Sequence, residues 1–249
     1  MNKRYFSRGI SFAVIYLVFT MNASATTFTI PASTTVGGQP VSTNAVFTIY
    51  DGLGQIDIQL NNTQANPTSV IQALSGLSFV LSTGQTSGSL LSMSGTQRTI
   101  NSDGSYSDGS TINSGWVLQT GSVLRLCVLC AGGTGPDYTL IGPEGADADS
   151  LYNNANGSIA GNGPHNPFFG DSLSFSLSVP GLTSDSAISS ATFFFGTTEG
   201  QDFVTVGGCT VDCGGPTRTP QNTVPEPSTF ILFGLALLGF SAWKRKQQG

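Results

Sequence analysis

Short stretches in which apolar and polar residues alternate run through this chain, and they constrain its fold more than any other feature. The clearest covers residues 54–61, where Ile56, Ile58 and Leu60 are separated by polar side chains. Successive side chains of a β-strand point to opposite faces of a sheet, so this spacing predicts a strand with one face in the core. No amphipathic pattern longer than two helical turns occurs, which argues against an α/β enzyme fold.

Similar stretches recur between turn-forming residues and predict roughly ten to twelve short strands. Besides 55–61, the expected strands cover residues 27–30, 45–50, 77–82, 89–93, 98–101, 116–119, 123–129, 138–141, 173–179, 191–195 and 203–206. This spacing favours an all-β fold, namely an antiparallel β-sandwich or jelly-roll-like single domain.

Turn signals predict how neighbouring strands are joined. Residues 51–54 read Asp-Gly-Leu-Gly and predict a hairpin between 45–50 and 55–61, because Asp-Gly supplies the positive φ of a tight turn. Ser69 is a candidate N-cap for a helical turn that would end at Gly76. We expect turn-rich loops over 101–110 and, apart from the strand at 138–141, over 131–170.

The first 25 residues have the pattern of a secretory signal peptide. Lys3, Arg4 and Arg8 precede an apolar run from Gly9 to Thr20, and Ala23-Ser24-Ala25 forms a cleavage site of the A-x-A type. We expect cleavage after Ala25, with Ala23 and Ala25 as the recognised small residues. The alternative is an uncleaved anchor, but the apolar run is short for a membrane span.

The C-terminal end combines a proline-rich linker, an apolar run and a basic end. The linker covers residues 214–228, the apolar segment 229–243, and the basic tail 244–249. The uncharged run of fourteen residues from Phe230 would be about 21 Å long as a helix, against about 30 Å of hydrocarbon. A buried core helix fits that length, but the run is apolar on every side, which favours a short transmembrane helix with a cytoplasmic basic tail.

These features resemble a PEP-CTERM sorting signal. The resemblance rests on Pro225-Glu226-Pro227, the apolar residues 230–240 and the basic stop Lys244-Arg245-Lys246. It implies a Gram-negative bacterial protein recognised by exosortase, a membrane cysteine protease or transpeptidase thought to act near the Pro-Glu-Pro motif. It also implies an association with exopolysaccharide and biofilm matrix. Parts of the core, such as residues 66–69 and 153–167, are similar to segments of other PEP-CTERM proteins, but this similarity implies no activity.

Charge limits the partners of the exported part. Residues 26–222, between the signal peptide and the residues of the sorting signal, contain three arginines (Arg98, Arg125 and Arg218) and thirteen acidic residues, which gives a net charge of −10. Nucleic acid is therefore excluded as a partner, because phosphate binding needs a basic patch. Gly, Ser, Thr and Asn dominate instead, a composition that suits divalent cations and neutral glycans.

The four cysteines form two local pairs, Cys127 with Cys130 and Cys209 with Cys213. In the cytosol this spacing would suggest zinc, but an exported domain favours disulfides. Two local disulfides are preferred, while a cross pairing, zinc and free thiols stay open. Redox catalysis is disfavoured because no helix pattern follows Cys130.

Candidate catalytic and metal residues are sparse. His165 is the one histidine and lies between prolines, so we expect a structural loop residue. Four acidic residues within one loop are candidate calcium ligands, although without EF-hand spacing a solvated acidic loop is the alternative. They are Asp137, Glu144, Asp147 and Asp149. A two-carboxylate glycosidase needs a pair across a cleft, which sequence cannot place.

Aromatic side chains in loops could stack on sugars, and Tyr106 and Tyr152 are the candidates. Taken together, the sequence predicts a non-enzymatic, exported surface or matrix protein that is transiently anchored in the inner membrane and processed by an exosortase. Residues 26–213 would form its β-sandwich-like domain, without a cofactor or with Ca²⁺. We expect a structural or adhesive role in exopolysaccharide, with a carbohydrate-binding module or a glycan hydrolase as alternatives.

Overall fold

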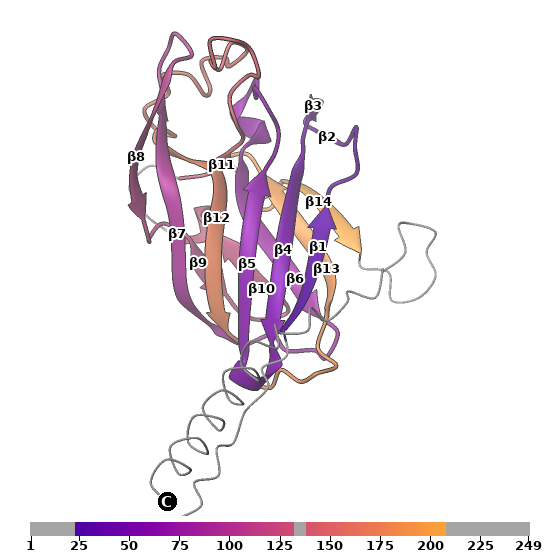
Figure 1. Ribbon diagram of the computed structural model, residues 1–249. Coiled ribbons are helices and arrows are strands. Elements are labelled where there is room, and N and C mark those ends of the chain that lie inside the picture. Colours follow the sequence, from indigo (N-terminus) through magenta and orange to yellow (C-terminus); the bar gives the residue numbers. More distant parts are fainter. Residues whose placement is uncertain (1–22, 132–137, 208–249) are drawn as a thin grey trace, which may run out of the picture. The chain divides into compact units, whose positions relative to one another are not determined.

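The structure is a computed structural model that describes residues 23–131 and 138–207. Within these residues the chain is mostly β, as the alternation predicts (Figure 1). The strands are β1 (Ala23–Thr29), β2 (Thr35–Val36), β3 (Gln39–Pro40), β4 (Thr43–Tyr50), β5 (Gln55–Asn62), β6 (Leu74–Leu81), β7 (Ser89–Ile100), β8 (Tyr106–Ile112), β9 (Val117–Gln119), β10 (Leu124–Cys127), β11 (Leu140–Ile141), β12 (Phe168–Ser178), β13 (Ile188–Phe195) and β14 (Asp202–Gly207).

The long strands form two layers that face each other, so the fold is sandwich-like. The first layer has the order β1-β4-β5-β12-β7-β8, and the second has the order β14-β13-β6-β10-β9 (Figure 1). Strand β11 links the layers, because it pairs with β12 and with β6. The β11–β12 pair is parallel, so the prediction of a purely antiparallel arrangement is wrong at this one link.

The hairpin predicted around residues 51–54 is confirmed. Strands β4 and β5 pair antiparallel from Thr43–Asn62 to Tyr50–Gln55. Ile56, Ile58 and Leu60 are buried, and the residues between them are half-buried on the outer face. The positive φ of the turn lies at Gly54, at 63°, and not in the Asp-Gly pair.

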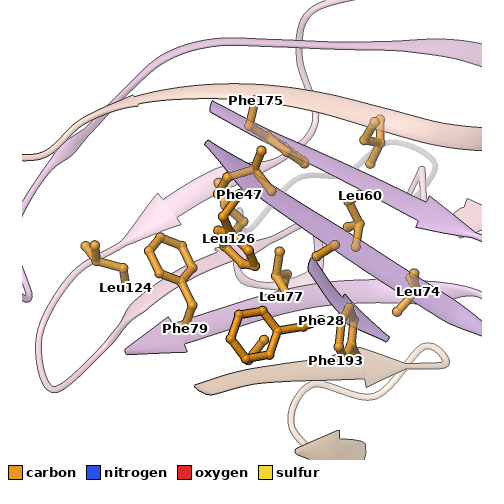
Figure 2. Close-up of a cluster of buried hydrophobic side chains, with 14 of the residues drawn as sticks. Phe28, Phe47, Leu60, Leu74, Leu77, Phe79, Leu124, Leu126, Phe175 and Phe193 are labelled. Atoms are coloured by element: carbon orange, nitrogen blue, oxygen red, sulfur yellow. The ribbon is translucent and has the colours of Figure 1, made fainter. Parts of the chain in front are cut away.

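The core lies between the two layers and is built from the inward residues of both. Figure 2 shows Phe47 and Phe175 of the first layer in one cluster of buried side chains with Leu77 and Phe79 of the second. The rings of Phe47 and Phe79 meet edge to face, with 5.1 Å between their centroids. Since both rings are 1% exposed or less, removing either would cost about 3–5 kcal/mol.

Several local predictions are wrong in their boundaries. Residues 89–93 and 98–101 belong to one long strand, β7, and the expected loop over 101–110 contains the start of β8. The helical turn after Ser69 is a 3-10 turn that ends at Gln72, and Leu74 already begins β6. Strand β6 pairs with both β10 and β13, so residues 74–81 lie inside the second layer.

One irregularity positions the polar cluster described below. The register between β12 and β7 shifts between Phe169 and Leu173, and Asp171 within this bulge has a φ of 60°. Bulges bend a strand and re-aim its side chains. Beside this bulge Arg98 and Ile100 of β7 are buried, and a second small apolar cluster forms there. Its members are Ile100, Ile141, Tyr152, Ile159 and Phe168.

Candidate functional site

The most concentrated group of charged side chains surrounds Arg98 on β7, and we call it the Arg98 cluster. Asp108 of β8 accepts two hydrogen bonds from Arg98, one from Nε at 2.6 Å and one from Nη2 at 2.9 Å. Asp171 of β12 accepts from Nη1 at 2.9 Å, and Glu144 lies 3.5 Å from the same nitrogen. The Arg98 side chain, 6% exposed, therefore links β7 to the two neighbouring strands and to the loop that carries Glu144.

The charged groups of this cluster shift one another's pKa values. Burial acts to lower the pKa of Arg98, but the hydrogen bond to Asp108 and the neighbouring groups outweigh it, so its pKa is raised. The same hydrogen bond lowers the pKa of Asp108. Burial raises the pKa of Asp171, against the opposing effect of Arg98. Burial, to which the negative charges of Glu144 and Asp108 add, therefore disfavours the ionised form of Asp171.

The prediction that Tyr152 stacks on sugars at the surface is wrong. Tyr152 is 1% exposed, accepts a hydrogen bond from Arg98 Nη1 at 3.1 Å and donates one to the carbonyl of Gly142 at 2.8 Å. Its loop looks exposed in sequence because it is polar, but it folds back over the Arg98 cluster. Burial raises the pKa of Tyr152.

Tyr106 is half-buried at the start of β8 and not in a loop as expected. The guanidinium carbon of Arg98 lies 4.4 Å from the centre of its ring, and the ring meets Tyr152 edge to face at 5.6 Å. One face of the ring is therefore occupied by a cation–π contact. Tyr106 therefore packs over the Arg98 cluster, and this face of its ring is not available to stack on a sugar.

Of the four acidic candidates for calcium, the structure describes Glu144, Asp147 and Asp149, and it does not gather these three into a cation site. Glu144 faces Arg98, Asp147 accepts a hydrogen bond from Asn153 Nδ2 at 2.5 Å, and Asp149 is exposed. Asp137 lies outside the described residues. Among the described residues, no group of three or more His, Cys, Asp and Glu side chains could hold a metal ion.

His165 lies in the loop that precedes β12, in a turn where its backbone N–H donates to the carbonyl of Asn162 at 3.0 Å. The side chain of the adjacent Asn166 binds the backbone of Ile100 through two hydrogen bonds. It accepts one from the Ile100 N–H at 3.1 Å and donates one to the Ile100 carbonyl at 3.0 Å. The segment around His165 thus anchors a loop to β7.

Cys127 and Cys130 form a disulfide, with their Cα atoms 5.7 Å apart. This is the first of the two local pairings favoured by the sequence, and it closes the end of β10 onto the 3-10 turn Leu129–Ala131. Cys209 and Cys213 lie outside the described residues.

The expected signal cleavage site lies in the first strand. Ala23 and Ser24 are exposed, and Ala25 pairs with Thr48 of β4. Cleavage after Ala25 would leave Thr26–Thr29 of β1. Phe28 remains in that part, 3% exposed and 5.8 Å from the ring of Phe47, so the apolar anchor of β1 would be retained.

Comparison with known proteins bears on the C-terminal end. Residues 223–246 match the family of the PEP-CTERM protein-sorting motif. The chain carries a PEP-CTERM sorting motif. This motif is the recognition signal for exosortase-type processing, so the protein is exported and sorted to the cell envelope with such an enzyme as partner. No curated protein matches the chain closely enough to count as a relative.

The PEP-CTERM match includes Pro225, Glu226 and Pro227 as well as Lys244, Arg245 and Lys246. All six lie outside the described residues, as do the expected linker and transmembrane helix. Within residues 23–131 and 138–207, no helix is long and apolar enough to cross a membrane.

Sequence reasoning missed the Arg98 cluster. Arg98, Asp108 and Asp171 are far apart in the chain, and their contact depends on the pairing of β8, β7 and β12. One signal was present: Arg98 is one of only three cations among thirteen acidic residues between the terminal segments. A rare cation within an apolar strand pattern needs buried partners, because an unpaired buried charge is costly.

Proposed function

We propose that this PEP-CTERM protein is a structural or adhesive component of an extracellular matrix, where its β-sandwich contacts exopolysaccharide without chemical turnover. The exosortase-type enzyme would recognise Pro225, Glu226 and Pro227, and the basic residues 244–246 would hold the tail at the inner membrane until processing. The exported domain would then remain at the cell surface or in the matrix.

The observation that carries this proposal is the outer surface of the first layer. The outward residues of β5 and β12 are amides and hydroxyls with few charges: Gln55, Asp57, Gln59, Asn61, Ser172, Ser174, Ser176 and Ser178. Such a surface matches the hydrogen-bonding groups of polysaccharides and does not repel them. The carboxylates of the Arg98 cluster lie close to a guanidinium, which supports a structural role for them rather than acid–base catalysis.

The test follows the protein in cells that carry an exosortase-type system. We expect the wild-type chain in the matrix fraction, and we expect the triple variant P225A/E226A/P227A to stay in the inner-membrane fraction. A variant altered just outside the motif, Gln221→Ala, is the matched control and should be sorted as the wild type. The proposal fails if the wild-type protein reaches the medium but does not co-sediment with purified exopolysaccharide.

A further inference from the structure

The outer face of the first layer is hollowed across four strands. A shallow groove of about 350 Å³ runs over β4, β5, β12 and β7. Neighbouring strands lie about 4.8 Å apart, so the groove spans about 14 Å between its outermost strands. Its side chains come in two rows across the sheet, Val46-Gln59-Ser174-Ser94 and Thr48-Asp57-Ser176-Ser92.

Hydrogen bonds within the groove fix its amide and its carboxylate. Asp57 Oδ1 accepts from Gln55 Nε2 and from Ser176 Oγ, both at 2.8 Å, while no described residue donates to Oδ2. Gln59 Oε1 accepts from Ser174 Oγ at 2.7 Å. Holding these groups in place before binding lowers the entropy lost when a ligand is bound.

Other polar groups of the groove are free to bind. The hydroxyls of Thr48, Ser92 and Ser94 make no hydrogen bond to another described residue, and Ser92 and Ser94 are exposed. Each hydroxyl can donate one hydrogen bond and accept others. Val46, half-buried in the first row, adds an apolar contact. The groove therefore offers alternating donors, acceptors and a small apolar patch.

The charge of the groove limits the classes of ligand that can bind there. Asp57 is the one charged side chain among the described residues that line it, so phosphate, sulfate and uronate groups would meet a negative charge without a cation. A single carboxylate is also too few ligands for a cation. Neutral sugars fit, because their hydroxyls donate to the carboxylate and accept from the serine and threonine hydroxyls.

We infer that this groove is a binding site for a neutral polysaccharide chain, with Asp57 and Gln59 as its central contacts. The inference rests on the proposed function and deepens it, since it names the ligand class and the face that binds. It also replaces Tyr106 and Tyr152 as the expected binding residues. Phe175 reaches the groove only from beneath, because its ring is 3% exposed and packs on Trp116, so contacts are mainly polar.

The test uses the exported protein, beginning at Thr26, in native gels that contain a neutral polysaccharide (hydroxyethylcellulose or galactomannan) or an anionic one (alginate). We expect retardation by a neutral polysaccharide and none by alginate. In D57A/Q59A the affinity for the neutral polysaccharide, measured from this retardation, should fall at least tenfold. If D57A/Q59A fails to fold, S92E/S94E tests the same groove, because its two positions are exposed and tolerate substitution. This variant should also lower the affinity at least tenfold.

The matched control is T192A/T205A. These two threonines share a hydroxyl contact of 3.0 Å between β13 and β14, on the outer face of the other layer. The control should bind as the wild type does, with an unchanged melting temperature. If the wild type binds but the groove variants bind equally well, the groove assignment is wrong and the proposed function stands. If the wild type binds only alginate, the ligand class is wrong. Failure to bind any polysaccharide overturns both.

Discussion

Arg98 and Asp108 are joined by two parallel hydrogen bonds across the β7–β8 pair, from Nε to Oδ1 and from Nη2 to Oδ2. A bidentate pair of this kind is the strongest form of arginine–carboxylate contact. Its arginine is buried and its aspartate is 43% exposed. The pair therefore secures β8, one of the two edge strands of the first layer, and leaves one partner in reach of water.

Replacing Arg98 by methionine should destabilise the protein by about 3 kcal/mol, at the low end for breaking a buried ion pair. The reason is that three carboxylates would lose their shared cation, although Asp108 and Asp171 can still be hydrated. Chemical denaturation measures the change. Arg125→Met is the control: the side chain of Arg125 is 19% exposed against 6% for Arg98, and it pairs with Glu199 alone, so its loss should cost under about 1 kcal/mol. Equal losses in both variants would contradict this account of the Arg98 cluster.

Asp108 and Asp171 should respond to pH in opposite ways. The lowered pKa of Asp108 means that its ionised form stabilises the fold above the unfolded value of about 3.9, and this contribution is lost as the pH falls through the folded pKa. The raised pKa of Asp171 means that its ionised form costs stability at neutral pH, a cost relieved as the pH falls through its folded pKa.

Melting temperatures of two asparagine variants between pH 7 and pH 3 test this difference. Asp108→Asn should be less stable than the wild type at pH 7, and the gap should narrow below about pH 4. Asp171→Asn should be at least as stable as the wild type at pH 7, since asparagine also tolerates the φ of 60° at this position. A large loss of stability in Asp171→Asn at pH 7 would contradict the claim that burial disfavours the ionised form of Asp171.

The disulfide between Cys127 and Cys130 should contribute little, because it closes a very short loop. Loop-closure entropy gives about 2 kcal/mol for a loop of this size, or roughly 4–8 °C in melting temperature. C127A/C130A should therefore melt a few degrees lower than the oxidised wild type. Dithiothreitol should lower the melting temperature of the wild type by a few degrees more than that of the variant, in which only the expected Cys209–Cys213 disulfide is left to reduce. A variant that melts with the oxidised wild type would contradict the disulfide contribution.

The exported domain should resist trypsin unless it unfolds. Between the terminal segments trypsin can cut only after Arg98, Arg125 and Arg218. Arg98 and Arg125 lie within β7 and β10, and their side chains are 6% and 19% exposed. We expect the native protein to be cut first after Arg218, in the linker predicted from sequence. Mass spectrometry of a time course measures this, with a urea-unfolded sample cut at all three sites as the control. Early cleavage after Arg98 would contradict the burial of its side chain within β7.

The strands could be predicted because their signal is local. Ile56, Ile58 and Leu60 show the inward face of β5 within a few residues, and the turn at 51–54 adds its partner β4. The same holds for Cys127 and Cys130, which are close in sequence. The sorting motif was also recognisable, because residues 225–227 and 244–246 lie in one continuous segment.

The functional features of the folded domain could not be predicted because they depend on contacts between distant residues. The Arg98 cluster depends on the bulge that turns Asp171 toward β7, and the sequence of neither strand by itself predicts that bulge. The burial of Tyr152 could not be predicted either, because its loop is polar and yet packs over the Arg98 cluster. The groove needs the register of β4, β5, β12 and β7, which brings Asp57 and Gln59 opposite Ser176 and Ser174.

The most direct test of this account is the intact mass of the native protein recovered from the matrix of cells that carry an exosortase-type system. We predict a chain that starts at Thr26 and ends near Pro225–Pro227, with Cys127 and Cys130 oxidised. Recovery of the full chain from the cytosol, with both terminal segments attached, would contradict export and sorting by the PEP-CTERM motif.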